Sequence, residues 1–214
     1  MPSIITHAAV PLALWCAADR GRIPAWLLAA GVVAAMLPDA DVLAFALHIP
    51  YADAFGHRGA SHSLLFACVL ATLAAVLAFF GSSRPWSAPH SSGSRRPWSA
   101  VSCQPRLAPT KAGPTVASTL QAAVFVFVCA ASHPLLDAMT SGGLGVALAW
   151  PWSEQRFFAP WRPIRVSPFA PQFFSARGVA TLLSELRWVW LPLATAVVAW
   201  KLIQPAPAAP RDPS

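Results

Sequence analysis

His133 and Asp137 are two side chains that can ligate a metal, and they close an otherwise apolar stretch from Val116 to Met139. Their spacing of four residues places both on one face of a helix, with Cβ atoms about 5–6 Å apart. A carboxylate at bilayer depth costs about 2.5–3.5 kcal/mol on insertion scales, so it is a functional candidate. A divalent cation offsets that cost, and imidazole with carboxylate is a common zinc ligand set. The alternative is a capping or interhelical hydrogen-bonded pair, since polar residues also join membrane helices.

Three further groups of histidine and aspartate favour the metal interpretation. They are His7 near the N-terminus, Asp39 and Asp41 in LPDAD, and His57 and His62 in GHRGASH. Each group alone also fits a structural role, such as a helix cap or an interfacial histidine. Together with the first pair, they hold four of the six histidines and three of the six aspartates. On an unbroken helix Asp39 and Asp41 point apart, so they share a site only if Pro38 interrupts the helix.

The composition indicates an integral membrane protein of one domain. Of 214 residues, 56% are hydrophobic and only 11% are charged, against about 25% charged in soluble proteins. The net charge is +7, but the basic residues lie in loops between apolar runs and form no basic helix. We therefore interpret them as determinants of topology and contacts to anionic lipid, and expect no nucleic-acid partner. Four cysteines without C-x-x-C spacing predict neither a disulfide framework nor a thiolate zinc site.

Five apolar segments predict an all-α polytopic membrane bundle with four to five transmembrane helices and a metal site at one membrane face. They cover residues 4–18, 24–47, 61–80, 116–139 and 187–203. The first is short for a span, and residues 178–186 are expected to form a short amphipathic turn of helix. We expect a single hydrolase-like domain over 1–203, with a disordered linker at 81–115 and a disordered tail at 204–214.

Alternating spans place all seven candidate ligands at the same membrane face. Nine of the 15 basic residues fall at the opposite face and six at the face of the site. Because basic residues concentrate on the cytoplasmic side, this distribution predicts a periplasmic or extracytoplasmic site.

The motifs resemble, in order, those of a bacterial family of inner-membrane metal-dependent hydrolases often described as LexA-regulated. The matching segments are TH at 6–7, LPDAD at 37–41, GHRGASHSL at 56–64, SHPLLDAMTSGG at 132–143, and WP and RFFAP between 150 and 160. The resemblance covers most of the chain outside the linker and the tail. It implies a multi-pass protein of the inner membrane with metal-dependent hydrolase activity. The H-x-x-x-[DE] pattern is also similar, more weakly, to that of zinc-dependent phospholipase C.

We accordingly expect hydrolysis of a lipid-borne or membrane-proximal ester, with a phosphoester favoured, at one or two divalent ions, preferably zinc. The expected metal ligands are His7, His57, His62, His133 and Asp137. Asp39 or Asp41 is expected to take the proton from water. Seven candidates exceed the four ligands of one tetrahedral zinc, so either two metals bind or several residues orient the ligands.

The loop at 150–174 holds the candidate substrate-binding residues Arg156, Arg162 and Arg165. A guanidinium group can form paired hydrogen bonds with phosphate oxygens, which suits a phospholipid-like substrate. The tryptophans and phenylalanines of the loop are also typical of an interfacial belt, in which arginines contact anionic lipid.

Two other classes of function stay open at this point. A metal or proton transporter also places histidine and aspartate within the membrane, although here they gather at one face and do not cross the bilayer. A non-catalytic scaffold would use its metal structurally, but such a site is usually closed by four ligands, and the surplus here favours an open one.

Overall fold

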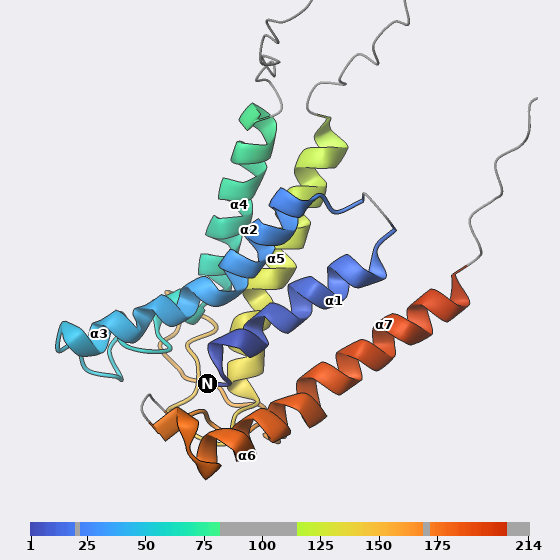
Figure 1. Cartoon of the computed structure of the whole chain (residues 1–214). Helices are drawn as coiled ribbons and strands as arrows, with labels where there is room; N and C mark the ends of the chain where they lie inside the picture. The colour runs from blue at the N-terminus through green and yellow to red at the C-terminus, as the bar shows by residue number, and fades with distance from the viewer. Residues whose placement is uncertain (20–21, 82–114, 169–171, 205–214) are drawn as a thin grey trace, which may run out of the picture.

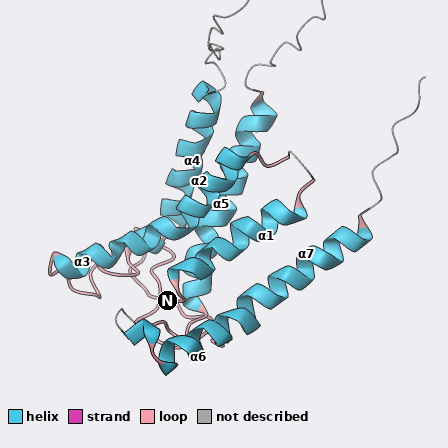
Figure 2. Ribbon diagram, viewed as in Figure 1, coloured by secondary structure: helices cyan, strands magenta, loops and turns pink. Residues whose placement is uncertain are grey.

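The computed structural model describes residues 1–19, 22–81, 115–168 and 172–204. Within these ranges every regular element is a helix, accompanied by two isolated β-bridges. Figure 1 and Figure 2 show helices that cross at different tilts, with irregular loops gathered at one end. The predicted all-α bundle is confirmed. The predicted linker and tail lie outside the described residues, apart from Gly81, Thr115 and Gln204.

Four helical runs in the described chain are long and apolar enough to cross a membrane: Ala25–Ala46, Leu64–Gly81, Val116–Ala138 and Ala176–Ile203. The N-terminal run Ile4–Ala17 is shorter, in line with the prediction for the first segment. It comprises the 3-10 helix η1 (Ile4–Ala8) and α1 (Ala9–Ala17). The single-domain boundary at 203 stays a prediction.

The second run changes its winding at LPDAD, as the proline predicted. The α-helix α2 (Ala25–Met36) gives way to the 3-10 helix η2 (Leu37–Val42), and α3 (Leu43–Ala46) completes the run. Pro38 lies in the first turn of η2, where a missing amide donor costs least. The tighter winding of η2 sets the directions of Asp39 and Asp41.

The last run contains the predicted amphipathic turn at 178–186, but this helix is longer than predicted and continues into the last apolar segment. The helix α6 (Ala176–Glu185) continues through a π-helical turn, η5 (Leu186–Trp190), into α7 (Leu191–Ile203). No glycine or proline interrupts residues 179–191, so nothing in the sequence stops the helix there. The π-turn instead shifts the helix phase between the amphipathic α6 and the apolar α7.

The core of the bundle is built where α5 (Val116–Ala138) packs against α2 and α4 (Leu64–Gly81). Its buried residues are mostly small: Ala34, Ala35, Ala67, Ala74, Ala122 and Ala130, with Phe125 and Cys129. Small side chains let helices approach closely, which is how membrane helices gain packing contacts. This packing brings the C-terminal end of α5 beside η2 and the 3-10 helix η3 (Ala60–His62).

Candidate metal centre

Four of the predicted residues offer ligand atoms that all lie within 4.8 Å of one another: Asp39, His62, His133 and Asp137. They come from η2, η3 and the last turns of α5, elements that meet at the end of the bundle where the N-terminus lies in Figure 1. All four side chains are buried. Residues almost a hundred positions apart in sequence therefore form one small cluster of nitrogen and oxygen donors.

His7 joins this cluster from the N-terminal segment. Its Nε2 lies 3.7 Å from Asp39 Oδ2 and 3.7 Å from Asp137 Oδ1. Its ring stacks on the ring of His133, with centroids 3.8 Å apart. We call these five residues (His7, Asp39, His62, His133 and Asp137) the candidate metal centre.

Hydrogen bonds fix the orientation of two of the three imidazoles. His133 Nδ1 lies 2.7 Å from the Ala35 carbonyl oxygen, so it must donate, and Nε2 then carries the lone pair. His62 Nδ1 lies 3.1 Å from Asp41 Oδ2, which points its Nε2 inward in the same way. The two Nε2 atoms face each other at 2.9 Å. Two lone pairs at that distance repel, so the arrangement requires a cation or a proton between them.

A proton on His62 is the alternative to a metal ion at this position. Burial alone would lower the pKa of His62, but the attraction of the adjacent carboxylates of Asp137 and Asp41 outweighs burial and raises the pKa to about 9. A metal ion would have to displace this proton, because a ligating imidazole is neutral.

Several polar atoms of the centre have no hydrogen-bond partner among the described residues. They are both ring nitrogens of His7 and both carboxylate oxygens of Asp39 and of Asp137. Arg58 Nε and His62 Nε2 approach Asp137 Oδ2 at 3.0 and 3.2 Å, but without hydrogen-bond geometry. Burying polar groups unpaired is costly. A divalent cation would engage His7 Nε2 and the nearby carboxylate oxygens together, and a set of imidazoles and carboxylates suits zinc, manganese or iron.

Asp41 and His57 lie beside the centre. Asp41 accepts from His57 Nδ1, from Ser61 Oγ at 2.6 Å and from the Arg58 amide at 2.9 Å, besides its contact with His62. The His57 ring is 6.0 Å from that of His62. A carboxylate behind a ligating histidine fixes the ring and raises its basicity. The predicted roles of His57 as a ligand and Asp41 as a base stay predictions.

Arg58 is a residue that the sequence interpretation missed. It is fully buried, and besides approaching Asp137 it donates to the Gly142 carbonyl at 3.0 Å and to Thr140 Oγ1 at 3.1 Å. Its backbone has a positive φ of 65°. The sequence HRGASH could have indicated this role, because Arg58 stands between two candidate ligands. A basic residue there supplies the positive charge that clustered carboxylates require.

The three arginines of the 150–174 loop have different surroundings. Arg156 donates to four carbonyl oxygens, those of Tyr51, Asp53, His57 and Arg58, at 3.0–3.2 Å. It therefore clamps the loop that carries His57. Arg162 and Arg165 are exposed, and the Arg162 guanidinium lies over the Phe158 ring at 4.7 Å. Substrate binding by these arginines stays a prediction.

Comparisons with known proteins agree with the membrane assignment. The model of the family described as YdjM inner membrane protein matches residues 1–208. The inner membrane protein YbcI of Escherichia coli (strain K12) is 42% identical over 193 residues, which cover 90% of this chain and 92% of that protein. No solved structure matches the chain. The relative's name and the four apolar helices support the predicted location in the inner membrane. With the family model covering nearly its whole length, the chain belongs to the YdjM family of inner membrane proteins.

Proposed function

We propose that the chain is a membrane-embedded, metal-dependent hydrolase that acts on a lipid-borne or membrane-proximal ester, with a phosphoester as the first class to test. The observation that supports this is the candidate metal centre, whose buried carboxylates and His7 have polar atoms without partners in the described chain. The centre lies at the end of apolar helices, so its substrate would be held at the membrane. The resemblance in the motif series supports the same reaction class.

The donor set fits one divalent ion, with zinc as the first choice because the donors are imidazole and carboxylate. His7, His62, His133 and Asp137 would complete four-coordination. When bound, the ion supplies Lewis acidity, which polarises an ester oxygen and makes water more acidic. A second ion would need His57 and Asp41, which are already hydrogen bonded to each other. We therefore propose a single ion.

Asp39 is the residue that we propose to take the proton from the attacking water. Its oxygens have no hydrogen-bond partner among the described residues, whereas those of Asp41 are engaged by His57, Ser61 and the Arg58 amide. Asp39 lies beside the histidines, with Oδ1 3.4 Å from His133 Nε2. It can therefore hold a proton at the centre while the other four donors hold the ion.

Other residues would prepare the centre and its substrate. Asp41 and the Ala35 carbonyl keep His62 and His133 turned inward. Arg58 holds Asp137. Of the three arginines of the 150–174 loop, Arg162 and Arg165 are exposed and could contact a phosphate at the bilayer surface. The partner that we propose is thus a membrane lipid or a lipid-linked molecule.

A structural metal site is the second candidate, and the burial of the centre favours it. His7, His62, His133 and Asp137 are each 0% exposed. A structural site is usually closed in this way, whereas a catalytic one keeps a position open for water or substrate. The enzyme proposal therefore requires an opening beside Asp39 or Asp41.

The deciding experiment measures metal and turnover on the same detergent-purified protein. We expect about one equivalent of zinc or a similar metal by elemental analysis, and hydrolysis on a panel of phospholipid and lipid-linked phosphate esters. Stoichiometric metal with no hydrolysis on the panel would favour the structural site. Gradient-driven ion flux in liposomes without hydrolysis would favour a transporter. A metal-replete preparation that holds no metal would overturn the proposal.

A further inference from the structure

A second buried polar cluster ties the last helical run to the N-terminal segment. Glu185, the last residue of α6, is 1% exposed. Its Oε2 accepts from Ser3 Oγ at 2.6 Å and from Thr6 Oγ1 at 2.7 Å, and its Oε1 accepts from the Ser3 amide at 2.5 Å. Trp190 completes the group by donating from Nε1 to Thr6 Oγ1 at 3.1 Å. We call these four residues the Glu185 cluster.

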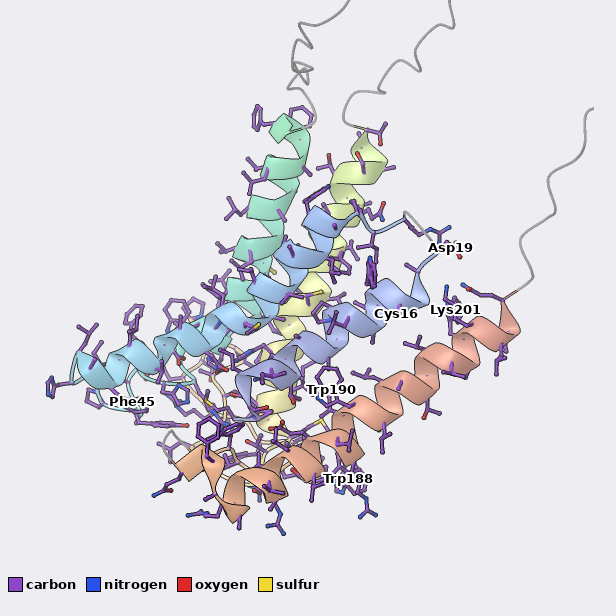
Figure 3. All side chains as sticks on the ribbon, viewed as in Figure 1. Cys16, Asp19, Phe45, Trp188, Trp190 and Lys201 are labelled. Atoms are coloured by element: carbon purple, nitrogen blue, oxygen red, sulfur yellow. The ribbon has the colours of Figure 1, made fainter. Side chains whose placement is uncertain are left out.

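The π-helical turn makes this cluster possible. In an α-helix of 3.6 residues per turn, positions five apart point roughly 140° apart. In a π-helix the hydrogen bonds join residues five apart. Leu186–Trp190 therefore has more residues per turn than an α-helix, and residues five apart lie closer to the same face. Glu185 and Trp190 consequently both reach Thr6. Figure 3 shows Trp190 on the side of the last helical run that faces α1. A π-turn inside a helix is frequently found at a functional site, and this one holds the N-terminal segment through Thr6.

That segment carries His7, the residue after Thr6 in η1. His62 and His133 have their rings fixed by hydrogen bonds at Nδ1. His7 differs, because in the described chain neither of its ring nitrogens has a hydrogen-bond partner. Its position rests on the stacking against His133 and on the backbone of η1. Whatever fixes that backbone therefore decides where the His7 imidazole lies.

We infer that Glu185 is a positioning residue for the metal centre, which holds η1 so that His7 can act as a ligand. The Glu185 side chain binds both Ser3, the residue before η1, and Thr6 within η1. Among the described residues, it is the one side chain of a distant helix that does so. Both oxygens of its carboxylate are engaged, with one hydrogen bond to Oε1 and two to Oε2. No cation of the described residues lies within ion-pair distance of it. The inference rests on the metal centre of the proposed function, but not on hydrolysis.

The test compares Glu185→Gln with His7→Ala in the full-length protein, using Co²⁺ and Zn²⁺ as the probes. An amide presents a donor where the carboxylate accepted, so Glu185→Gln breaks the cluster with little change in size. Loss of a group that orients a metal ligand typically weakens metal binding about 10–100-fold, and Glu185 orients His7 through Ser3 and Thr6. We expect that loss for Glu185→Gln, with the Co²⁺ absorption spectrum changed toward that of His7→Ala. The double variant should bind no more weakly than His7→Ala alone, because both changes remove the same ligand.

Matched controls keep the inference falsifiable. Glu154→Gln changes an exposed glutamate of the 150–174 loop and should leave metal affinity and spectrum as in wild type. If Glu185→Gln does not fold, Thr6→Val removes one donor, keeps the shape, and should shift affinity and spectrum in the same direction by a smaller factor. Unchanged affinity and spectrum in a folded Glu185 or Thr6 variant would overturn the inference, as would additive losses in the double variant.

Hydrogen exchange separates this inference from the proposed function. Breaking the cluster should speed amide exchange in residues 3–8 without affecting Leu64–Gly81, whether or not metal is present. Wild type that binds metal but hydrolyses nothing would end the enzyme proposal and leave the Glu185 result standing. Exchange at 3–8 that is equal in wild type and Glu185→Gln would end the inference even in an active hydrolase.

Discussion

Two buried carboxylate clusters lie at the same end of this molecule, and they differ in how their oxygens are satisfied. In the metal centre, the oxygens of Asp39 and Asp137 have no hydrogen-bond partner among the described residues. In the Glu185 cluster, one carboxylate receives three hydrogen bonds from backbone and hydroxyl donors. Both sets of groups are nearly inaccessible to water, so solvent does not explain the difference.

The difference shows what each cluster is suited to do. A carboxylate whose two oxygens both accept hydrogen bonds from protein donors is stable without a ligand and fixes the backbone that supplies the donors. Carboxylates and imidazoles that converge with too few hydrogen-bond donors are costly to bury, and a bound cation reduces that cost. The Glu185 cluster organises the chain, whereas the candidate metal centre has the donors that could hold an ion. Each prediction below changes one side of this contrast.

The largest effect is expected from Asp39→Asn. The amide cannot accept a proton from water, and a general base typically contributes about 10²–10⁴-fold to rate. We expect turnover on the best ester of the panel to fall by that factor, while elemental analysis still finds about one metal per chain. Loss of metal in parallel with turnover would assign Asp39 to the ligands and remove it from the role of base.

Arg58→Met is expected to produce the next largest effect. It leaves Asp137 buried without its cation, and removing one partner of a buried ion pair costs about 3–5 kcal/mol. The metal-free protein should therefore unfold at a clearly lower temperature in detergent, and added zinc should restore much of the loss. Arg162→Met, at an exposed arginine, is the control and should stay within about 0.5 kcal/mol of wild type. A loss that zinc does not reduce would argue against an ion at Asp137.

The sequence predicted much of this arrangement, because membrane constraints are local. Spans follow from apolar length, and the change of winding at LPDAD follows from Pro38. Alternation of spans placed all seven candidate ligands at one end, where the structure also has them. Ligand-type residues are rare in apolar segments, so their positions were informative before any fold was known.

What escaped prediction depends on contacts between distant segments. Glu185 meets Ser3 across 182 positions, and no local pattern marks that pairing. The continuity of α6 into α7 depends on a π-turn, which periodicity does not reveal. Arg156 was predicted to bind a substrate phosphate because of its charge. In the structure it binds four carbonyl oxygens of a loop about a hundred residues earlier. The types of the residues indicate which chemistry is available, but the contacts of each side chain in the fold decide its partners.

Asp41→Asn tests the hydrogen bonds that lie behind His62 at the candidate metal centre. Asparagine keeps the size but cannot accept from His57, Ser61 and the Arg58 amide as a charged carboxylate does. Removing such an outer partner should weaken zinc binding by about 10–100-fold, measured by competition with a chelator. Asp19→Asn, at an exposed residue paired with Arg22, should leave the affinity unchanged. An Asp41 variant with wild-type affinity but little turnover would instead support Asp41 as the base.

The smallest effect is expected from Gly143→Ala, and it tests whether backbone shape alone keeps Arg58 at the centre. Gly143 has a φ of +91°, and a Cβ there would lie 2.6 Å from Arg58 Nη1. Strain of this kind costs about 1–3 kcal/mol, and part of it should be relieved by moving the Arg58 guanidinium. We expect a modest loss of thermal stability and a weakening of zinc binding smaller than that of Asp41→Asn.

The neighbouring Gly142→Ala is a strict control, because its added Cβ meets nothing closer than Val166 at 3.5 Å. Equal effects at 142 and 143 would show that the loop tolerates no side chain at all, and that the contact with Arg58 is not what requires glycine. An effect at 143 alone, abolished in the Arg58→Met background, would show that Gly143 is required to keep the Arg58 guanidinium beside Asp137.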